Sequence, residues 1–168
     1  MRTYTVIDSP VGPLTIVAGD GQIRCLYMDL QRHRPHDTEL GELDPRGREA
    51  EPFMSAADQL DAYFAGQRTC FDLPLAPCGS EFQQRVWAAL QEIPYGETES
   101  YGELATRIGS PGAARAVGLA NGKNPIGIVI PCHRVVGSDG SLTGYGGGLD
   151  AKRALLDLEL AVSGAALF

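Results

Sequence analysis

The chain has 168 residues, of which 43% are hydrophobic and 21% charged, a balance typical of globular proteins rather than disordered ones. This length suits one domain of ordinary size or two small ones. Because no apolar run approaches the roughly 20 residues that cross a bilayer, and the N-terminus carries no apolar signal segment, we expect neither a membrane protein nor a secreted one, but a cytoplasmic protein.

The net charge of −7 argues against indiscriminate nucleic-acid binding. The acidity is unevenly spread, because residues 1–78 hold 7 Lys/Arg against 12 Asp/Glu while residues 79–168 hold 7 against 9. Within residues 100–138 the charged side chains are Arg107, Arg115, Lys123 and Arg134 against Glu103. One face of the second half can therefore still meet phosphates, weakly and with marked salt sensitivity.

The first 30 residues predict three strands. The β-prone segments 3–8, 14–18 and 23–28 are separated by Gly- and Pro-containing turns, which indicates two hairpins and a small antiparallel sheet. Residues 31–52 are polar and contain three prolines and two glycines, so we interpret them as a loop.

An apolar stripe at helical spacing over residues 53–64 predicts a helix that ends near Gly66. Residues 72–79 contain two prolines and form the predicted linker. We therefore expect an N-terminal domain over residues 1–76 and a C-terminal domain over residues 77–168.

The second half begins with a predicted helix at about 80–92, which Pro94 stops. Ser100 and Glu103 fit a capping box at the start of a helix that runs to Gly109. A further helix at roughly 112–121 follows after a short turn, and this spacing predicts a helix-turn-helix. The helix at 112–121 is rich in Gly and Ala. These small residues allow either close packing between helices or entry of the helix into a narrow DNA groove, with Arg115 projecting from the helix.

The four cysteines are Cys25, Cys70, Cys78 and Cys132, and none forms a CxxC pair. Cys25, His33, His36 and Cys70 match the spacing of no common zinc site, so we predict no metal. We interpret the first three cysteines as small, mostly buried hydrophobic residues.

Cys132 follows a predicted short strand at 128–130 and precedes His133. A thiol beside an imidazole is a potential nucleophilic site, because the thiolate is the reactive form and a nearby positive charge favours it. The alternative is a buried cysteine beside a solvated histidine, since neighbours on an extended strand point in opposite directions. The surroundings favour chemistry: Asn124 can brace a tight turn, and the glycines around Tyr145 allow backbone to approach a flat ligand.

The second half resembles the O6-alkylguanine-DNA alkyltransferases, also called methylated-DNA–protein-cysteine methyltransferases. The matching segments, in the order and spacing of the family, are Phe82-Gln-Gln-Arg-Val-Trp87, Ile93-Pro-Tyr-Gly-Glu-Thr98, Ser100-Tyr-Gly-Glu-Leu-Ala105, Ala113-Ala-Arg-Ala-Val-Gly118, Asn124-Pro125, Ile130-Pro-Cys-His-Arg-Val135 and Gly144-Tyr-Gly-Gly-Gly148. They cover about 80 of the 168 residues, and the Pro-Cys-His-Arg-Val pentapeptide is highly specific in this setting. In the first half, Asp8-Ser-Pro-Val-Gly12 and Ala62-Tyr-Phe64 are also similar to the family.

The resemblance implies that Cys132 accepts the alkyl group in an SN2-like displacement. His133 would take the thiol proton through a water, and Glu159 would hold the imidazole in the useful tautomer. On the residues alone, Glu159 in the apolar run 154–162 would be read as an exposed helix charge.

The resemblance also implies a pocket for the damaged base. Tyr101 would protonate or hydrogen-bond N3 of guanine, and the backbone around Tyr145 and Gly146 would hold O6. The carbonyls of Cys132 and Val135 would accept from the exocyclic amine, and Asn124 would fix the turn that bears the cysteine. Asn121 stands next to this pocket where some family members have a long apolar residue, so it affects pocket size.

DNA would be held through the minor groove, with Arg115 filling the space of the flipped-out nucleotide. The helix surface formed by Ala114, Ala116 and Gly118 would enter the groove, and Ser110 and Ser138 would contact the DNA as well. Gly19 stands where one cysteine ligand of zinc-containing family members would fall, in keeping with the prediction of no metal.

The predicted fold is α+β: a small antiparallel sheet with a helix, ribonuclease-H-like by resemblance, and a mostly helical C-terminal domain with a winged-helix-like helix-turn-helix. The predicted function is single-turnover repair of O6-alkylguanine, and by implication O4-alkylthymine, in double-stranded DNA by a monomer without a cofactor. Two alternatives are a non-catalytic alkyltransferase-like protein that only binds the lesion, and a Cys-His hydrolase. The first lacks the acceptor cysteine, and the second needs an oxyanion hole and turns over repeatedly.

Overall fold

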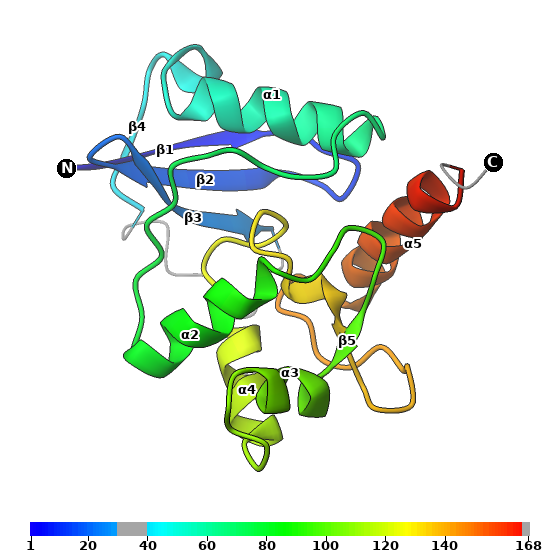
Figure 1. The fold of residues 1–168 in the computed structure, drawn as a ribbon. Coiled ribbons are helices and arrows are strands. Elements are labelled where there is room, and N and C mark those ends of the chain that lie inside the picture. The colour runs from blue at the N-terminus through cyan, green and yellow to red at the C-terminus, as the bar shows by residue number, and fades with distance from the viewer. Residues whose placement is uncertain (30–39, 166–168) are drawn as a thin grey trace.

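The computed structural model describes residues 1–29 and 40–165. It opens with a four-stranded sheet of order β3-β2-β1-β4 (Figure 1). β1 (Arg2–Ile7), β2 (Leu14–Gly19) and β3 (Gln22–Met28) pair antiparallel, as the sequence predicted. Asp20 and Gly21 link β2 to β3, and both have positive φ (54° and 75°), the conformation of a tight two-residue hairpin turn.

One helix covers one face of this sheet. α1 (Phe53–Phe64) begins and ends where the apolar stripe predicted, and it buries Phe53, Ala56, Ala57, Leu60 and Tyr63. Figure 1 shows α1 lying across the strands on one side of the sheet. The helix therefore carries Tyr63 toward the second half of the molecule rather than toward solvent.

The prediction of a loop over residues 31–52 is wrong in part. Residues 42–43 form β4 (Glu42–Leu43), which pairs parallel with β1, and residues 47–49 form the short 3-10 helix η2 (Gly47–Glu49). Such short elements carry no periodic signal, and a tertiary contact with β1 decides that β4 forms. Residues 31–39 of the predicted loop lie outside the described part of the chain.

The second half is mostly helical. α2 (Glu81–Leu90), α3 (Tyr101–Arg107) and α4 (Ala114–Gly122) gather at the end of the molecule away from α1 (Figure 1). The capping box of Ser100 and Glu103 forms as predicted, and Ser80 and Gln83 form a second one at the start of α2. The Trp87 indole donates a hydrogen bond of 2.8 Å to the Ala120 carbonyl and so joins α2 to α4.

Two further elements frame the site. β5 (Glu99–Ser100) pairs parallel with β6 (Val135–Val136), and α5 (Leu149–Ala165) reaches the turn that follows α1, where Val162 lies near Gly66. None of the helices in the described residues is both long and apolar enough to span a membrane.

The strand predicted at 128–130 does not form. These residues are turns, and Ile128 has a φ of +70°. The preceding residues pair with β3 instead: Leu26 N–H donates to the Pro125 carbonyl, and Gly127 N–H donates to the Leu26 carbonyl. This pairing between distant segments bends the chain just before Cys132.

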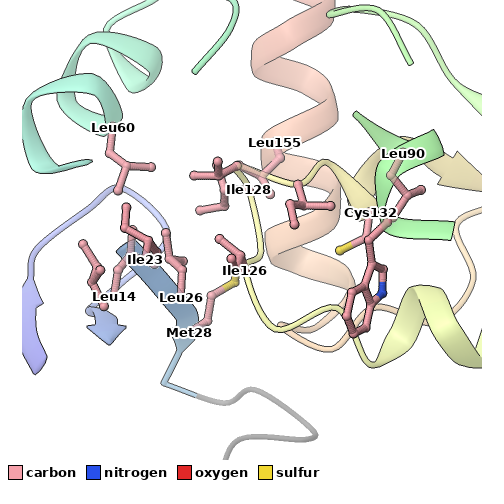
Figure 2. Packing of buried hydrophobic residues seen from close by; sticks show 14 of the residues in the cluster. Leu14, Ile23, Leu26, Met28, Leu60, Leu90, Ile126, Ile128, Cys132 and Leu155 are labelled. Atoms are coloured by element: carbon pink, nitrogen blue, oxygen red, sulfur yellow. The ribbon is translucent and has the colours of Figure 1, made fainter. Parts of the chain in front are cut away.

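A single hydrophobic core joins the two halves. Figure 2 shows Leu14, Ile23 and Leu60 of the first half facing Ile126, Ile128 and Leu155 of the second, with Cys132 at the edge of the same cluster. The predicted linker also docks, since Ile23 N–H donates to the Pro74 carbonyl and Ala76 N–H donates to the Ile23 carbonyl. The observed architecture confirms the predicted α+β class.

Candidate active site

Cys132 lies at the start of η3 (Cys132–Arg134), a single 3-10 turn, rather than at the end of a strand. Its side chain is 6% exposed, and burial raises the pKa of the thiol above its usual value. A hydrogen bond from the Asn124 amide, the charge of Lys152 and contact with the Tyr145 hydroxyl act in the opposite direction. The thiol is therefore held mainly protonated, next to groups that stabilise its anion.

Asn124 shapes the turn that leads to the cysteine. Its Nδ2 donates to the Ile130 carbonyl at 2.8 Å, and its Oδ1 accepts from Ile126 N–H at 3.0 Å. One side chain thus spans the turn, as the sequence analysis expected of this position, and in addition contacts the thiol.

His133 is fully buried, and its Nε2 lies 2.6 Å from Oε2 of Glu159. Because a carboxylate can only accept, Nε2 carries the proton and Nδ1 is the basic nitrogen. Within the described residues, Nδ1 has no hydrogen-bond partner from the protein. Burial lowers the pKa of His133, although the Glu159 carboxylate opposes this, so the imidazole is neutral and able to accept a proton.

Glu159 is 1% exposed, which overturns its reading as an exposed helix charge. Arg134 donates from Nε to Oε1 at 2.7 Å and from Nη2 to Oε2 at 3.1 Å. Burial alone would raise the pKa of Glu159, but hydrogen bonds and charge from His133 and Arg134 lower it to about 2. The carboxylate is therefore ionised inside the protein, where an ordinary buried carboxyl would be neutral.

Two more groups reach the same carboxylate from distant segments. The Tyr63 hydroxyl donates to Oε2 at 2.6 Å, and Gly96 N–H donates to Oε1 at 3.3 Å. Gly96 has a φ of +81°, and a Cβ there would lie 2.3 Å from Ser163 Oγ, so only glycine permits this close approach to α5.

Lys152 is a site residue that the sequence analysis missed. It is fully buried, and its Nζ donates to the carbonyls of Val135 at 2.6 Å and Thr143 at 2.8 Å. Burial lowers the pKa of Lys152 to about 8, although the nearby thiol of Cys132 acts in the opposite direction. Its position three residues after Leu149 in an amphipathic helix gave no signal that the ammonium group points inward.

Tyr63 and Arg134 were missed for related reasons. Tyr63 belonged to an apolar stripe and was counted as core, and Arg134 was counted among the cations available to phosphate. Only their contact with Glu159 reveals a role at the site.

The residues expected to hold the base lie around Cys132. Tyr101 donates from its hydroxyl to the Thr143 carbonyl at 3.2 Å, and Tyr145 and Gly146 are buried. The two carbonyls expected to meet the exocyclic amine already accept bonds, that of Val135 from Lys152 and that of Cys132 from Asn121 at 3.3 Å. The Cys132 carbonyl also accepts from the Val135 N–H, so both of its lone pairs already have donors within the protein.

Asn121 is 3% exposed and lies beside Cys132. Its Nδ2 donates to the Cys132 carbonyl, and its Oδ1 has no partner among the described residues. Asn121 is thus a short and polar side chain at the position where some family members have a long apolar one.

The residues expected to meet DNA lie mostly at the surface. Arg115, Ala116 and Ser138 are exposed, whereas Ala114, Gly118 and Ser110 are half-buried. A Cβ at Gly118 would lie 3.7 Å from the Tyr101 ring, so the small residues of α4 also allow close packing onto α3. Both interpretations of the Gly- and Ala-rich helix therefore have support, one on each of its faces.

The other cysteines correct one prediction. Cys25 is buried, but Cys70 and Cys78 are exposed, because the segment that carries them runs over the surface as a linker. Within residues 1–29 and 40–165, no three His, Cys, Asp or Glu side chains converge as a metal site would require. His33 and His36 lie outside the described residues.

Together these groups combine a buried thiol with the imidazole of the next residue, whose tautomer is set by an ionised carboxylate. With a water bridging to the unpartnered Nδ1 of His133, such an arrangement can accept the thiol proton and release a nucleophilic sulfur.

Two family models match consecutive parts of the chain and together cover most of it. Residues 3–77 match the ribonuclease-like domain of 6-O-methylguanine DNA methyltransferase, and residues 81–161 match its DNA binding domain.

Curated relatives are similar over nearly their whole length. A methylated-DNA–protein-cysteine methyltransferase of Mycolicibacterium paratuberculosis is 57% identical over 167 residues, which cover 99% of this chain and 98% of the relative. One from Methanosarcina acetivorans is 50% identical over 156 residues, covering 93% and 97%. Among solved structures, Mycobacterium tuberculosis OGT in complex with DNA is 56% identical with a TM-score of 0.88, and the match covers 95% of this chain and 94% of that one.

Proposed function

The chain belongs to the 6-O-methylguanine DNA methyltransferase family, and on that basis we propose which of its residues carry out the reaction. The function itself is DNA repair by direct reversal, in which an alkyl group passes from methylated DNA to a cysteine of the protein. DNA is accordingly its partner.

We propose that Cys132 is the acceptor. The observation that carries this assignment is the hydrogen-bonded series Arg134–Glu159–His133, which ends beside the only cysteine that contacts Asn124, Lys152 and Tyr145. Cys25 is buried in the sheet, whereas Cys70, just before the linker, and Cys78, within it, are exposed, and none of the three has such partners.

The proposed reaction is a displacement at the alkyl carbon. The Sγ–H proton of Cys132 passes through one water to His133 Nδ1, and Sγ attacks the alkyl carbon. A C–S bond forms as the bond from carbon to O6 breaks, and the electron pair of that bond goes to the guanine ring. Tyr101 stabilises this charge by donating a hydrogen bond to N3. The guanine anion then takes up a proton at N1 from solvent as His133 returns its proton to solvent, which leaves an ordinary guanine and a thioether on the protein. Because nothing in the site removes a thioether, each molecule acts once.

The proposed recognition uses α4. Arg115 would enter the duplex where the damaged nucleotide leaves it, with Ala114, Ala116 and Gly118 against the minor groove and Ser110 and Ser138 near the backbone. The base would lie between Tyr101, Tyr145, Gly146 and the carbonyls of Cys132 and Val135, with Asn121 at the edge. The same proposal includes repair of O4-alkylthymine by a monomer that needs no cofactor. It places the protein in the cytoplasm and the boundary between its two domains at residues 76 and 77.

The test is intact-mass measurement after incubation with a duplex that contains one O6-methylguanine. We expect a gain of about 14 Da at one site per molecule, because a methyl group replaces the thiol proton, and peptide mapping should place it on Cys132. Cys132→Ala should bind the duplex and gain no mass, whereas Cys70→Ser, the matched control, should behave as wild type. An adduct on another cysteine would contradict the assignment, and repeated turnover would instead support a Cys-His hydrolase.

A further inference from the structure

A side chain from the N-terminal half reaches the proposed catalytic network. The Tyr63 hydroxyl lies 2.6 Å from Oε2 of Glu159, and His133 Nε2 lies 2.6 Å from the same oxygen. Tyr63 and Glu159 are 96 residues apart in sequence, on α1 and α5. Two donors from different segments thus share one carboxylate oxygen.

Tyr63 is firmly held in this position. Its side chain is fully buried, and its ring contacts Phe64 edge-on at 5.2 Å, Phe71 at 5.4 Å and Tyr95 at 6.1 Å between centroids. Burial and the neighbouring Glu159 raise the pKa of Tyr63 far above its ordinary value. The phenol is therefore always protonated and always a donor.

Tyr63 is not needed to place the carboxylate. Arg134 donates to both oxygens of Glu159, and Gly96 N–H donates to Oε1. What Tyr63 adds is a second neutral donor on the oxygen that holds the histidine. A carboxylate oxygen that already accepts one strong hydrogen bond attracts a further proton less strongly.

We propose that Tyr63 is a positioning residue that lowers the reactivity of the Cys132 thiol in the resting protein. Its hydroxyl donates to Glu159 Oε2, the oxygen that also accepts from His133, so the carboxylate stabilises a protonated His133 less strongly. The inference rests on the proposed roles of His133 and Glu159. A protein whose single acceptor thiol reacts only once benefits from a lower thiol reactivity before DNA is bound, since other electrophiles would otherwise alkylate the thiol and inactivate the protein. It also makes the reactivity of Cys132 depend on the docking of α1.

The groups that face this pair come from every surrounding element. They are Tyr63 on α1, Tyr95 after α2, Cys132 and Arg134 on η3, Tyr145 in the following loop and Lys152 on α5. Only Tyr63 and Arg134 donate side-chain hydrogen bonds to Glu159 besides His133 among the described residues. Tyr63→Phe therefore changes one bond and leaves every charge in place.

The experiment follows the rate at which Cys132 reacts with iodoacetamide between about pH 5 and pH 10, measured on its peptide by mass spectrometry. We expect Tyr63→Phe to react about two- to fivefold faster at neutral pH, with the acid limb of the profile moved to higher pH, because the imidazolium is better stabilised. Glu159→Gln should react more slowly, since the imidazolium loses its carboxylate.

Two controls separate this effect from a loosened fold. Tyr95→Phe removes a neighbouring buried hydroxyl that has no partner among the described residues, and it should match wild type. In a Glu159→Gln background, Tyr63→Phe should have no further effect, whereas an increase caused by easier access to the thiol would persist.

The outcomes are distinct. If Tyr63→Phe reacts at the wild-type rate or more slowly, and Glu159→Gln is slow, the inference is overturned and the proposed catalytic roles stand. If Glu159→Gln also reacts at the wild-type rate, the proposed roles of His133 and Glu159 are overturned too. If Tyr63→Phe does not fold, 3-fluorotyrosine at position 63 keeps the ring and donates more strongly. The inference then requires slower reaction than wild type, and equal or faster reaction overturns it.

Discussion

Glu159 and Lys152 are charged side chains in the interior, on one helix and close to one thiol. Glu159 remains ionised because three side chains and a backbone N–H donate to it, and one of them is the permanently charged guanidinium of Arg134. Lys152 has no carboxylate partner recorded in the described part of the chain and rests on two carbonyl oxygens. The two residues therefore respond differently to pH, since one pKa is lowered by its partners and the other by burial.

Replacing Lys152 with methionine removes a positive charge beside the thiol. We expect Lys152→Met to slow the reaction of Cys132 with small electrophiles at neutral pH several-fold, because the charge of Lys152 stabilises the thiolate. The pH profile of that reaction, moved to higher pH, is the measurement. A profile identical to that of wild type would show that the ammonium group only braces the loop at Thr143.

Lys152 also links stability to pH with a definite sign. The pKa of Lys152 is about 8 in the folded protein and 10.5 ordinarily, so between these values the unfolded chain binds the extra proton. The stability of wild type relative to Lys152→Met should therefore rise as the pH increases from about 8 to 10.5, by on the order of 2 kcal/mol. Urea titrations of both proteins at several pH values check this difference.

At the scale of elements, α4 has two distinct faces. Its buried face packs Val117 and Ala120 into the core, and Gly118 brings it against Tyr101. Its outer face exposes Arg115, and Leu119 one turn later is 65% exposed. A slim helix with one long exposed side chain would suit the insertion into a duplex that we propose for Arg115.

If Arg115 stabilises the flipped-out nucleotide, it acts only on duplex substrate. Flipping a base costs roughly a few kcal/mol, and the free base incurs no such cost, so Arg115→Ala should slow duplex repair more than tenfold and barely change the reaction with free O6-benzylguanine. The ratio of the two rates, measured at saturating protein, is the observable. A simple phosphate contact would instead weaken binding to damaged and undamaged DNA alike, with no change in that ratio.

The whole molecule carries a net charge of −7, and in residues 100–138, the segment with the local excess of positive charge, the structure ties up half of the cations. Of the four in residues 100–138, Arg134 is buried against Glu159, and Arg107 pairs with Glu92 and Glu99. For Arg115 and Lys123, no ion pair with another described residue is recorded. The local excess of positive charge in the sequence thus overstates the charge that phosphates can meet.

We therefore predict a shallow salt dependence for duplex binding. With about two or three phosphates neutralised, the slope of log K against log salt should lie near −2 and not exceed about −3 in size, since each contact contributes about 0.9. Fluorescence anisotropy between about 50 and 300 mM salt measures this slope, and Lys123→Gln should flatten it by about one. A slope of −5 or steeper would show that further cations contact the DNA.

The local signals of this chain were sufficient for most of its elements, and they marked Cys132 as a candidate nucleophile. The three strands, α1 and the capping box at Ser100 follow from periodicity and from the residues that satisfy free N–H groups, which are short-range effects. The resemblance in residues 82–148 supplied the expected site, from Tyr101 to Tyr145.

Tertiary structure decided what those residues can do. The turn before Cys132 is braced locally by Asn124, but its direction is set by residues 125–127, which pair with β3 about 100 residues earlier. Glu159 and Lys152 look like ordinary surface charges in an amphipathic helix until α5 packs against η3. Tyr63 joins them only because the two halves share one core. Burial and hydrogen bonds between distant segments set the charge of each group, and a one-dimensional pattern does not contain those distances.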